Sequence, residues 1–255
     1  MTKKYLIIGA GAIGAFYASK LSQAGEEIII WSRNDSQKIS QAGYQINSYL
    51  GNYNFRPHRI IKNLSDLNTE VDYIIIATKA LPSIDIVSIL KEIITINSTI
   101  VIIQNGIHVE NEIAKNFTKN QIISCIAFIG VSRLSANEIN HQAYGKLIIG
   151  NFNKINQESI NLFAKSLKTS GIETEITKNI LFERWKKLIW NGAFNPLSVV
   201  LGKKTTKQII DNPLSLELAK NIMREIAMIA KVDNCELPND IIESNILATE
   251  KMPPY

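Results

Sequence analysis

The chain has few of the residue types that build disulfide frameworks and metal centres. Its 255 residues include only two cysteines, Cys125 and Cys235, which stand far apart in the chain. This argues against a disulfide scaffold and indicates a reducing, cytoplasmic environment. The three histidines, His58, His108 and His141, show no ligand-like spacing to one another or to cysteine. We therefore expect no metal site.

Long apolar runs and a one-sided charge distribution are also missing. No apolar run reaches the roughly 18–20 residues of a membrane span, and no secretory signal pattern opens the chain, so we expect no membrane partner. The formal net charge is +5, but the lysines are scattered rather than gathered in one stripe. Such a mildly basic surface suits an anionic small molecule, and we expect no nucleic-acid partner.

The first part of the chain alternates short apolar runs with amphipathic stretches. The expected strands are Lys4–Gly9, Glu27–Trp31, Tyr73–Ala77, Thr99–Ile103, Ile122–Ile129, Lys146–Gly150 and Glu173–Ile176. The expected helices between them are Ala12–Ala24, Ser83–Ile94, Val109–Phe117 and Ser159–Ser170. Continuous apolar strands that alternate with helices are typical of a parallel sheet covered on both faces.

After about Lys178 the pattern changes, because no strand pattern recurs. Asn179–Leu201, Pro213–Lys231 and Asp240–Glu250 each have helical spacing of apolar residues. The sequence predicts an α/β protein with two domains. An N-terminal nucleotide-binding domain with a Rossmann-type parallel sheet covers residues 1–178, and a smaller all-helical domain covers 179–255. We expect them to meet in a cleft beside the carboxyl ends of the strands.

A glycine motif, GAGAIG at residues 9–14, follows the first apolar run and precedes the first helix. Strand, glycine turn and helix are the context that a dinucleotide-binding fingerprint requires. In this interpretation Gly9 allows the tight turn, Gly11 lets the backbone approach a pyrophosphate, and Gly14 lets the helix pack closely on the strand.

The same region predicts which dinucleotide binds. The helix begins at Ala12 and Ile13, and its first N–H groups and positive dipole end suit a phosphate. The second strand ends in Ser32 and Arg33, with no acidic residue until Asp35. An arginine at this place pairs with a 2′-phosphate, and Ser32 can add a hydroxyl donor, so we favour NADP(H). The alternative is that Arg33 is an ordinary surface residue and Asp35 binds the ribose.

Polar residues also follow the third and fourth expected strands. Thr78 and Lys79 come after one of these strands, and Gln104, Asn105 and Gly106 after the other. The carboxyl ends of the strands form the ligand-binding edge of this architecture. These residues are therefore candidates, although a solvated lysine would equally explain Lys79.

A second motif lies in the first helix of the helical region, at residues 183–197. Lys187, Asn191 and Asn195 recur there every fourth residue and share one helix face. Burying such groups unpaired is costly, and a ligand with a carbonyl and a carboxylate would supply partners. A solvated polar face is the alternative.

The combined motifs resemble the ketopantoate reductase (2-dehydropantoate 2-reductase) family. The resemblance rests on GAGAIG, on the TKA of residues 78–80, on the QNG of residues 104–106 and on W-x-K-L-x-x-N-x-x-x-N-P-L at residues 185–197. It covers the chain from end to end and keeps the motifs in order.

The resemblance implies reduction of 2-dehydropantoate to pantoate with NADPH, on the route to pantothenate and coenzyme A. It makes Lys187 the catalytic general acid, and Asn191 and Asn195 the asparagines that hold the substrate. Asn105 would lie near the nicotinamide ribose and the substrate. On the cofactor side, the resemblance assigns the 2′-phosphate to the positions of Arg33 and Lys79.

The chain also departs from the family pattern. Members usually continue past the last helix into a Ser-Met-Leu-Gln-Asp-like stretch and a Thr-Glu-Ile-Asp-like stretch, whereas this chain stops at Met252–Tyr255. We expect either a truncated helical domain or an altered function. Two alternatives stay open: an NADPH-dependent reductase of another 2-keto acid, and a non-catalytic NADP-binding regulator. Apolar surface on the helical domain could also form a homodimer contact.

Overall fold

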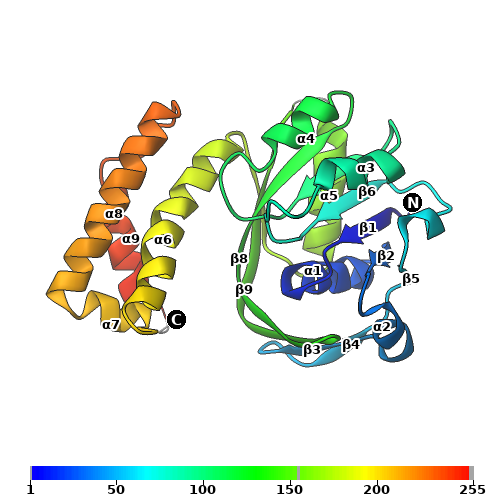
Figure 1. The fold of residues 1–255 in the computed structure, drawn as a ribbon, viewed down its shortest axis with the longest axis horizontal. Helices are drawn as coiled ribbons and strands as arrows, with labels where there is room; N and C mark the ends of the chain where they lie inside the picture. The colour runs from blue at the N-terminus through cyan, green and yellow to red at the C-terminus, as the bar shows by residue number, and fades with distance from the viewer. Residues whose placement is uncertain (1, 154–155, 253–255) are drawn as a thin grey trace. The chain divides into compact units, whose positions relative to one another are not determined.

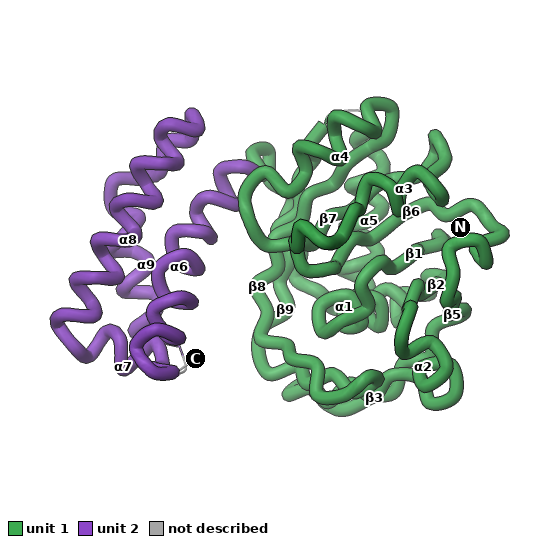
Figure 2. The backbone as a smooth tube through the Cα atoms, in the orientation of Figure 1, with its two compact units in different colours: residues 1–180 green, residues 181–255 purple. Residues whose placement is uncertain are grey.

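The computed structural model describes residues 2–153 and 156–252. The chain forms two compact units, Met1–Ile180 (unit 1) and Leu181–Tyr255 (unit 2), shown in Figure 2. Each unit has a hydrophobic core of its own. Residues 253–255, at the end where we expected the truncation, lie outside the described residues.

Unit 1 consists of strands and helices that largely alternate along the chain (Figure 1). Its strands are β1 (Lys4–Ile8), β2 (Glu27–Trp31), β3 (Tyr44–Ser48), β4 (Tyr53–Phe55), β5 (Arg59–Ile61), β6 (Tyr73–Ile76), β7 (Thr99–Ile102), β8 (Ile122–Ser135), β9 (Glu138–Asn151) and β10 (Thr174–Thr177). Its helices are α1 (Ala12–Gln23), α2 (Ser36–Ala42), α3 (Ile86–Ile93), α4 (Asn111–Asn116) and α5 (Gln157–Thr169), with a 3-10 turn, η1 (Leu64–Asp66).

The strands form one sheet in the order β4-β3-β9-β8-β7-β6-β1-β2-β5, with β10 beside β9. From β8 to β5 every pair is parallel. Ile8 of β1 lies opposite both Trp31 of β2 and Ile76 of β6, and Ile76 lies opposite Ile102 of β7. These four strands therefore finish level, and the loops that follow them leave the sheet along one edge.

Side-chain alternation along the strands explains why both faces are covered. On β1, Tyr5 and Ile7 belong to the core that α1 and α5 complete, whereas Leu6 and Ile8 belong to the core that α3 and α4 complete. Successive residues of a strand point to opposite faces, so an uninterrupted apolar strand needs helices on both. The predicted α/β class with a Rossmann-type parallel sheet is confirmed.

The largest difference from the sequence prediction lies in β8 and β9. The prediction ended one strand at Ile129 and began the other at Lys146, but both run for 14 residues and pair antiparallel. In Figure 1 they curve away toward β3 and β4. The outer half has no uninterrupted apolar run, because exposed and partly buried residues mix there. The short elements α2, β3, β4 and β5 were not predicted for the same reason.

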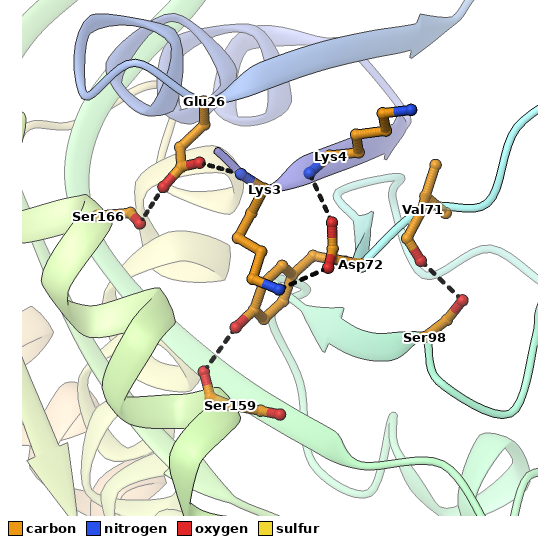
Figure 3. Close-up of polar contacts among 9 residues, drawn as sticks. Lys3, Lys4, Glu26, Val71, Asp72, Ser98, Ser159 and Ser166 are labelled. Atoms are coloured by element: carbon orange, nitrogen blue, oxygen red, sulfur yellow. Dashed lines mark hydrogen bonds and ion pairs between the residues drawn. The ribbon is translucent and has the colours of Figure 1, made fainter. Parts of the chain in front are cut away.

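A polar cluster joins the strands at the opposite, amino-terminal end of the sheet (Figure 3). The Glu26 carboxylate accepts from the Lys3 backbone N–H at 2.6 Å and from the Ser166 hydroxyl of α5 at 2.5 Å. The Asp72 carboxylate accepts from the Lys3 ammonium and from the Lys4 backbone N–H, both at 2.8 Å. This cluster ties the start of β1 to the segments before β2 and β6, away from the carboxyl edge.

Unit 2 is helical in the part of the chain that the structure describes. Its helices are α6 (Ile180–Val200), which begins at the last residue of unit 1, α7 (Thr206–Ile210), α8 (Pro213–Val232) and α9 (Ile241–Glu250). The three long helices agree with the sequence prediction. The short α7 was missed, although Thr205 and Gln208 form a capping box at its start. No helix among the described residues has the length and apolar character that crossing a membrane would require.

Candidate functional site

The glycine motif forms a tight turn between β1 and α1. Gly9 has φ +90°, and a Cβ there would lie 2.5 Å from the Thr78 backbone nitrogen. A Cβ on Gly14 would lie 2.3 Å from the Gly9 carbonyl oxygen, so neither position has room for a side chain. A Cβ on Gly11, by contrast, would have no other atom within 4 Å. Gly11 therefore presents open backbone at the carboxyl edge of the sheet.

The start of α1 is well suited to an anion. Gly11 is the N-cap residue, so no side chain caps the helix, and the first turn has no acidic residue. The first N–H groups of an α-helix have no partner within the helix, and the helix dipole is positive there. Ala12 and Ile13, the first residues of α1, are partly exposed. The turn and the helix start together fit the pyrophosphate of a dinucleotide.

The segment after β2 holds the residues that were expected to distinguish NAD from NADP. Arg33 is exposed, and its guanidinium carbon lies 5.5 Å from the centre of the Trp31 ring. Ser32 is partly exposed and donates its backbone N–H to the Ile61 carbonyl at 3.0 Å. Asp35 is already in an ion pair, because its carboxylate lies 2.6 Å from the Arg133 guanidinium. The carboxylate is therefore partly neutralised, which weakens the alternative that it binds the ribose.

Gln104 connects the polar segments that follow β6 and β7. It is buried, and its side-chain amide donates to the Thr78 carbonyl at 3.0 Å and to the Thr78 hydroxyl at 2.9 Å. The neighbouring candidates Lys79 and Asn105 are exposed. The sequence placed Gln104 within a motif but gave it no role. A buried amide at a strand end was the available signal, since such groups need hydrogen-bond partners.

In unit 2, Lys187, Asn191 and Asn195 lie on successive turns of α6. Lys187 and Asn191 are partly buried, and Asn195 is exposed. Burial, reinforced by the nearby Arg184 guanidinium, lowers the pKa of the Lys187 ammonium to about 8. A lysine with such a pKa exchanges its proton near neutral pH, which is what a general acid requires.

The lysine beside it is different. Lys186 is half exposed, with an exposed side-chain fraction of 50%, and its ammonium lies 3.6 Å from the Glu183 carboxylate. This is an ordinary surface ion pair between residues on adjacent helical turns. Of these two consecutive lysines, Lys186 is exposed and Lys187 is partly buried.

The packing of α6 sets its rotation within unit 2. Trp185 donates its indole N–H to the Asp233 carboxylate at 2.8 Å, and Trp190 donates to the Thr249 hydroxyl at 2.9 Å. A Cβ on Gly192 would lie 2.6 Å from the Ile226 side chain of α8. Both tryptophans are therefore packing residues of unit 2. These contacts determine which face of α6 is left for Lys187 and the two asparagines.

The described residues include no cluster of three or more His, Cys, Asp or Glu side chains that could hold a metal ion. His141 is buried, with its ring nitrogens 2.9 Å from the Ser48 hydroxyl and from the Tyr144 carbonyl, and burial lowers its pKa. His58 accepts a backbone N–H from Ile28 at 3.1 Å. Both histidines are thus bonded to neighbouring protein groups. Cys125 is a core residue.

Comparisons with known proteins agree with this architecture. Residues 5–154 match the family described as ketopantoate reductase PanE/ApbA, and residues 179–255 match its C-terminal family. A 2-dehydropantoate 2-reductase of Nostoc sp. is 28% identical over 258 residues, which cover 99% of this chain and 80% of that protein.

Solved structures lead to the same family. The crystal structure of 2-dehydropantoate 2-reductase from Methylococcus capsulatus superposes with a TM-score of 0.90 at 38% identity, covering 99% of this chain and 81% of that one. A ternary structure of D-mandelate dehydrogenase with NADH and anilino(oxo)acetate shares the fold, with a TM-score of 0.87 at 22% identity over 97% of this chain and 80% of that one. The chain belongs to the ketopantoate reductase family of pyridine-nucleotide-dependent oxidoreductases.

Proposed function

We propose that this protein reduces 2-dehydropantoate to pantoate with NADPH, and that Lys187 is the general acid. Family membership supports the substrate, since the relatives from Nostoc sp. and Methylococcus capsulatus are named for this reaction. The observation that carries the mechanism is the partly buried Lys187 ammonium, with a pKa of about 8, on the polar face of α6.

The reaction needs a hydride at the carbonyl carbon and a proton at the carbonyl oxygen. Reduced nicotinamide, when bound, supplies the hydride. Negative charge develops on the carbonyl oxygen during this transfer. Lys187 stabilises that charge and donates its proton, which leaves a neutral amine and the product alcohol. Asn191 and Asn195 supply amide groups for the substrate carboxylate and hydroxyl without adding net charge.

We assign the cofactor to unit 1, as expected for residues 1–178, and the substrate to the helical region, residues 179–255. The glycine turn (Gly9, Gly11 and Gly14) and the helix start at Ala12 and Ile13 would bind the pyrophosphate. Ser32, Arg33 and Lys79 would bind the 2′-phosphate, and Asn105 would lie near the nicotinamide ribose.

NADPH rather than NADH is proposed from the residues after β2. Arg33 is exposed and able to pair with a phosphate. The nearest acidic residue, Asp35, is held by Arg133. The fold alone does not decide the cofactor, because D-mandelate dehydrogenase with the same fold is named with NADH.

The test is the oxidation of NADPH, followed by absorbance, when 2-dehydropantoate is added to the purified protein. We expect turnover, a large loss of turnover with NADH, and no turnover for Lys187→Ala. Lys186→Ala is the matched control, since it removes the adjacent, surface-paired lysine, and it should keep the wild-type rate. Turnover of other 2-keto acids in place of 2-dehydropantoate would contradict the assigned substrate. An active Lys187→Ala variant would contradict the assigned acid.

A further inference from the structure

Arg133 lies near the end of β8. It belongs to the outer part of the β8–β9 hairpin, residues 130–145, which we call the β8–β9 arm and which the sequence did not predict. Its side chain donates to the carbonyls of Ser135 at 2.9 Å and of Ala136 at 3.1 Å, within the turn of the hairpin. These bonds hold the guanidinium close to its own backbone.

Hydrogen bonds also fix the turn between β8 and β9 to the start of β3. Asn137 accepts the Gln45 backbone N–H at 2.8 Å and donates its side-chain amide to the Gly43 carbonyl at 3.1 Å. Gln45 also lies opposite Glu138 in the parallel pairing of β3 with β9. The position of Arg133 is therefore set by the sheet rather than by a free loop.

From this position Arg133 reaches the segment after β2. Its guanidinium nitrogen Nη2 lies 2.6 Å from Oδ2 of Asp35, two residues beyond Arg33. The exposed side-chain fractions are 36% for Arg133 and 33% for Asp35, so the pair is partly shielded but accessible to a ligand. The residues following the second strand are where this fold contacts the adenosine ribose.

Tyr44 connects the pair to the glycine turn. The buried Tyr44 phenol donates to the Ala10 carbonyl at 3.4 Å. Burial raises the pKa of this phenol, while the Arg133 charge acts to lower it and the Asp35 charge to raise it. The Tyr44 hydroxyl therefore contacts the glycine turn, and the charges of Arg133 and Asp35 act on its pKa in opposite directions.

We propose that Arg133 is a specificity-determining residue, which makes the site select a 2′-phosphate over a free 2′-hydroxyl. An unpaired carboxylate at Asp35 would accept a hydrogen bond from a ribose 2′-hydroxyl and repel a phosphate. Arg133 neutralises that carboxylate, so the pair no longer repels a phosphate that Arg33 binds. This inference rests on the proposed use of NADPH, but the selection acts in binding and does not require turnover.

The experiment measures the dissociation constants of 2′,5′-ADP and 5′-AMP for the full chain by calorimetry. In Arg133→Gln we expect 2′,5′-ADP to bind about tenfold more weakly, because the Asp35 carboxylate loses its counter-charge and repels the 2′-phosphate, and 5′-AMP to change by less than about twofold. Adding Asp35→Asn to Arg133→Gln should recover part of the loss, because the exposed carboxylate is then removed. Arg133→Lys should keep most of the preference.

Lys146→Gln is the matched control, because it removes a cation from the same hairpin. Lys146 pairs with Glu173 and Glu175, both at 3.1 Å, rather than with Asp35. We expect it to leave the affinity for both nucleotides unchanged.

Melting temperatures of all variants identify any loss of folding. Asp35→Asn alone tests the ion pair while the bonds of Arg133 to the hairpin stay intact. This variant should bind 2′,5′-ADP at least as tightly as the wild type.

An unchanged ratio of the two dissociation constants in Arg133→Gln would overturn the inference and leave Arg133 as an anchor of the hairpin. A wild-type protein without preference for 2′,5′-ADP would overturn it too. If the preference and its loss are found but 2-dehydropantoate is not reduced, the inference stands and the proposed reaction fails. The two failures are thus distinguishable.

Discussion

At Lys187, burial has lowered the pKa of the ammonium to about 8, whereas the adjacent Lys186 remains a surface residue paired with Glu183. Burial destabilises the charged ammonium relative to the neutral amine, so the buried ammonium is a stronger acid than an exposed one. Two consecutive lysines on one helix thus have different surroundings.

This residue predicts the pH dependence of the reaction. A general acid works in its protonated form, so kcat/KM should be constant below the pKa of Lys187 and fall tenfold per pH unit well above about pH 8. The measurement is kcat/KM for 2-dehydropantoate between about pH 6 and pH 10, with Lys186→Ala as the control that keeps the profile. A profile that stays flat through this range would rule out Lys187 as the proton donor.

The glycine motif allows structure and binding to be separated one residue at a time. Gly14→Ala should lower the free energy of unfolding by about 1–3 kcal/mol, because its Cβ would lie 2.3 Å from the Gly9 carbonyl oxygen. Gly11→Ala should leave stability nearly unchanged, since the position is open and its φ of −75° suits any residue. It should nevertheless weaken NADP binding, because the methyl group would occupy the space of the pyrophosphate. Urea unfolding and calorimetry measure the two effects. Tight NADP binding by Gly11→Ala would contradict the assignment.

At the level of elements, the two ends of the parallel sheet have different roles. The carboxyl ends carry the open Gly11, the exposed Arg33 and the loops that Gln104 ties together. The amino ends carry a satisfied polar cluster around Glu26 and Asp72 (Figure 3). The first end offers open backbone at Gly11 and the exposed Arg33 to a ligand, while the polar residues at the second end hold strands together.

Asp72→Ala tests this division. It leaves the Lys4 backbone N–H and the Lys3 ammonium without their acceptor, so we expect the free energy of unfolding to fall by about 1–3 kcal/mol. The affinity for NADP should not change, because Asp72 precedes β6 at the end of the sheet away from the glycine turn. Equilibrium unfolding with a calorimetric titration of NADP checks both parts. A selective loss of NADP affinity would contradict the division.

At the scale of the whole molecule, the two units have separate hydrophobic cores. The cores of unit 1 are formed by its sheet with α1–α5, and the core of unit 2 by α6–α9. Units with their own cores can fold independently.

We therefore expect residues 1–180, expressed alone, to fold and to bind NADP, but to have no reductase activity because Lys187 is absent. Circular dichroism and a calorimetric titration measure the two properties, and the full chain is the control. A fragment that is folded but binds no NADP would contradict the assignment of the cofactor to unit 1.

Local patterns in the sequence predicted the central strands, the helices that cover them, and the three long helices of unit 2. They succeeded because buried elements repeat apolar residues at regular spacing, and the glycine motif has a fixed local geometry. The outer β8–β9 arm and the short elements α2 and β3–β5 were missed. They are short or half exposed, so their periodicity is weak.

The sequence by itself was enough to identify the family, the glycine turn and the polar face at Lys187, Asn191 and Asn195. Only the tertiary structure decided which charged and polar groups are already paired. Arg133 and Asp35 are separated by 98 positions in the chain, and Gln104 bonds to a residue of a different strand end. The pKa of Lys187 likewise depends on burial. Partners and burial are set by segments that meet only on folding, and no local pattern records which segments those are.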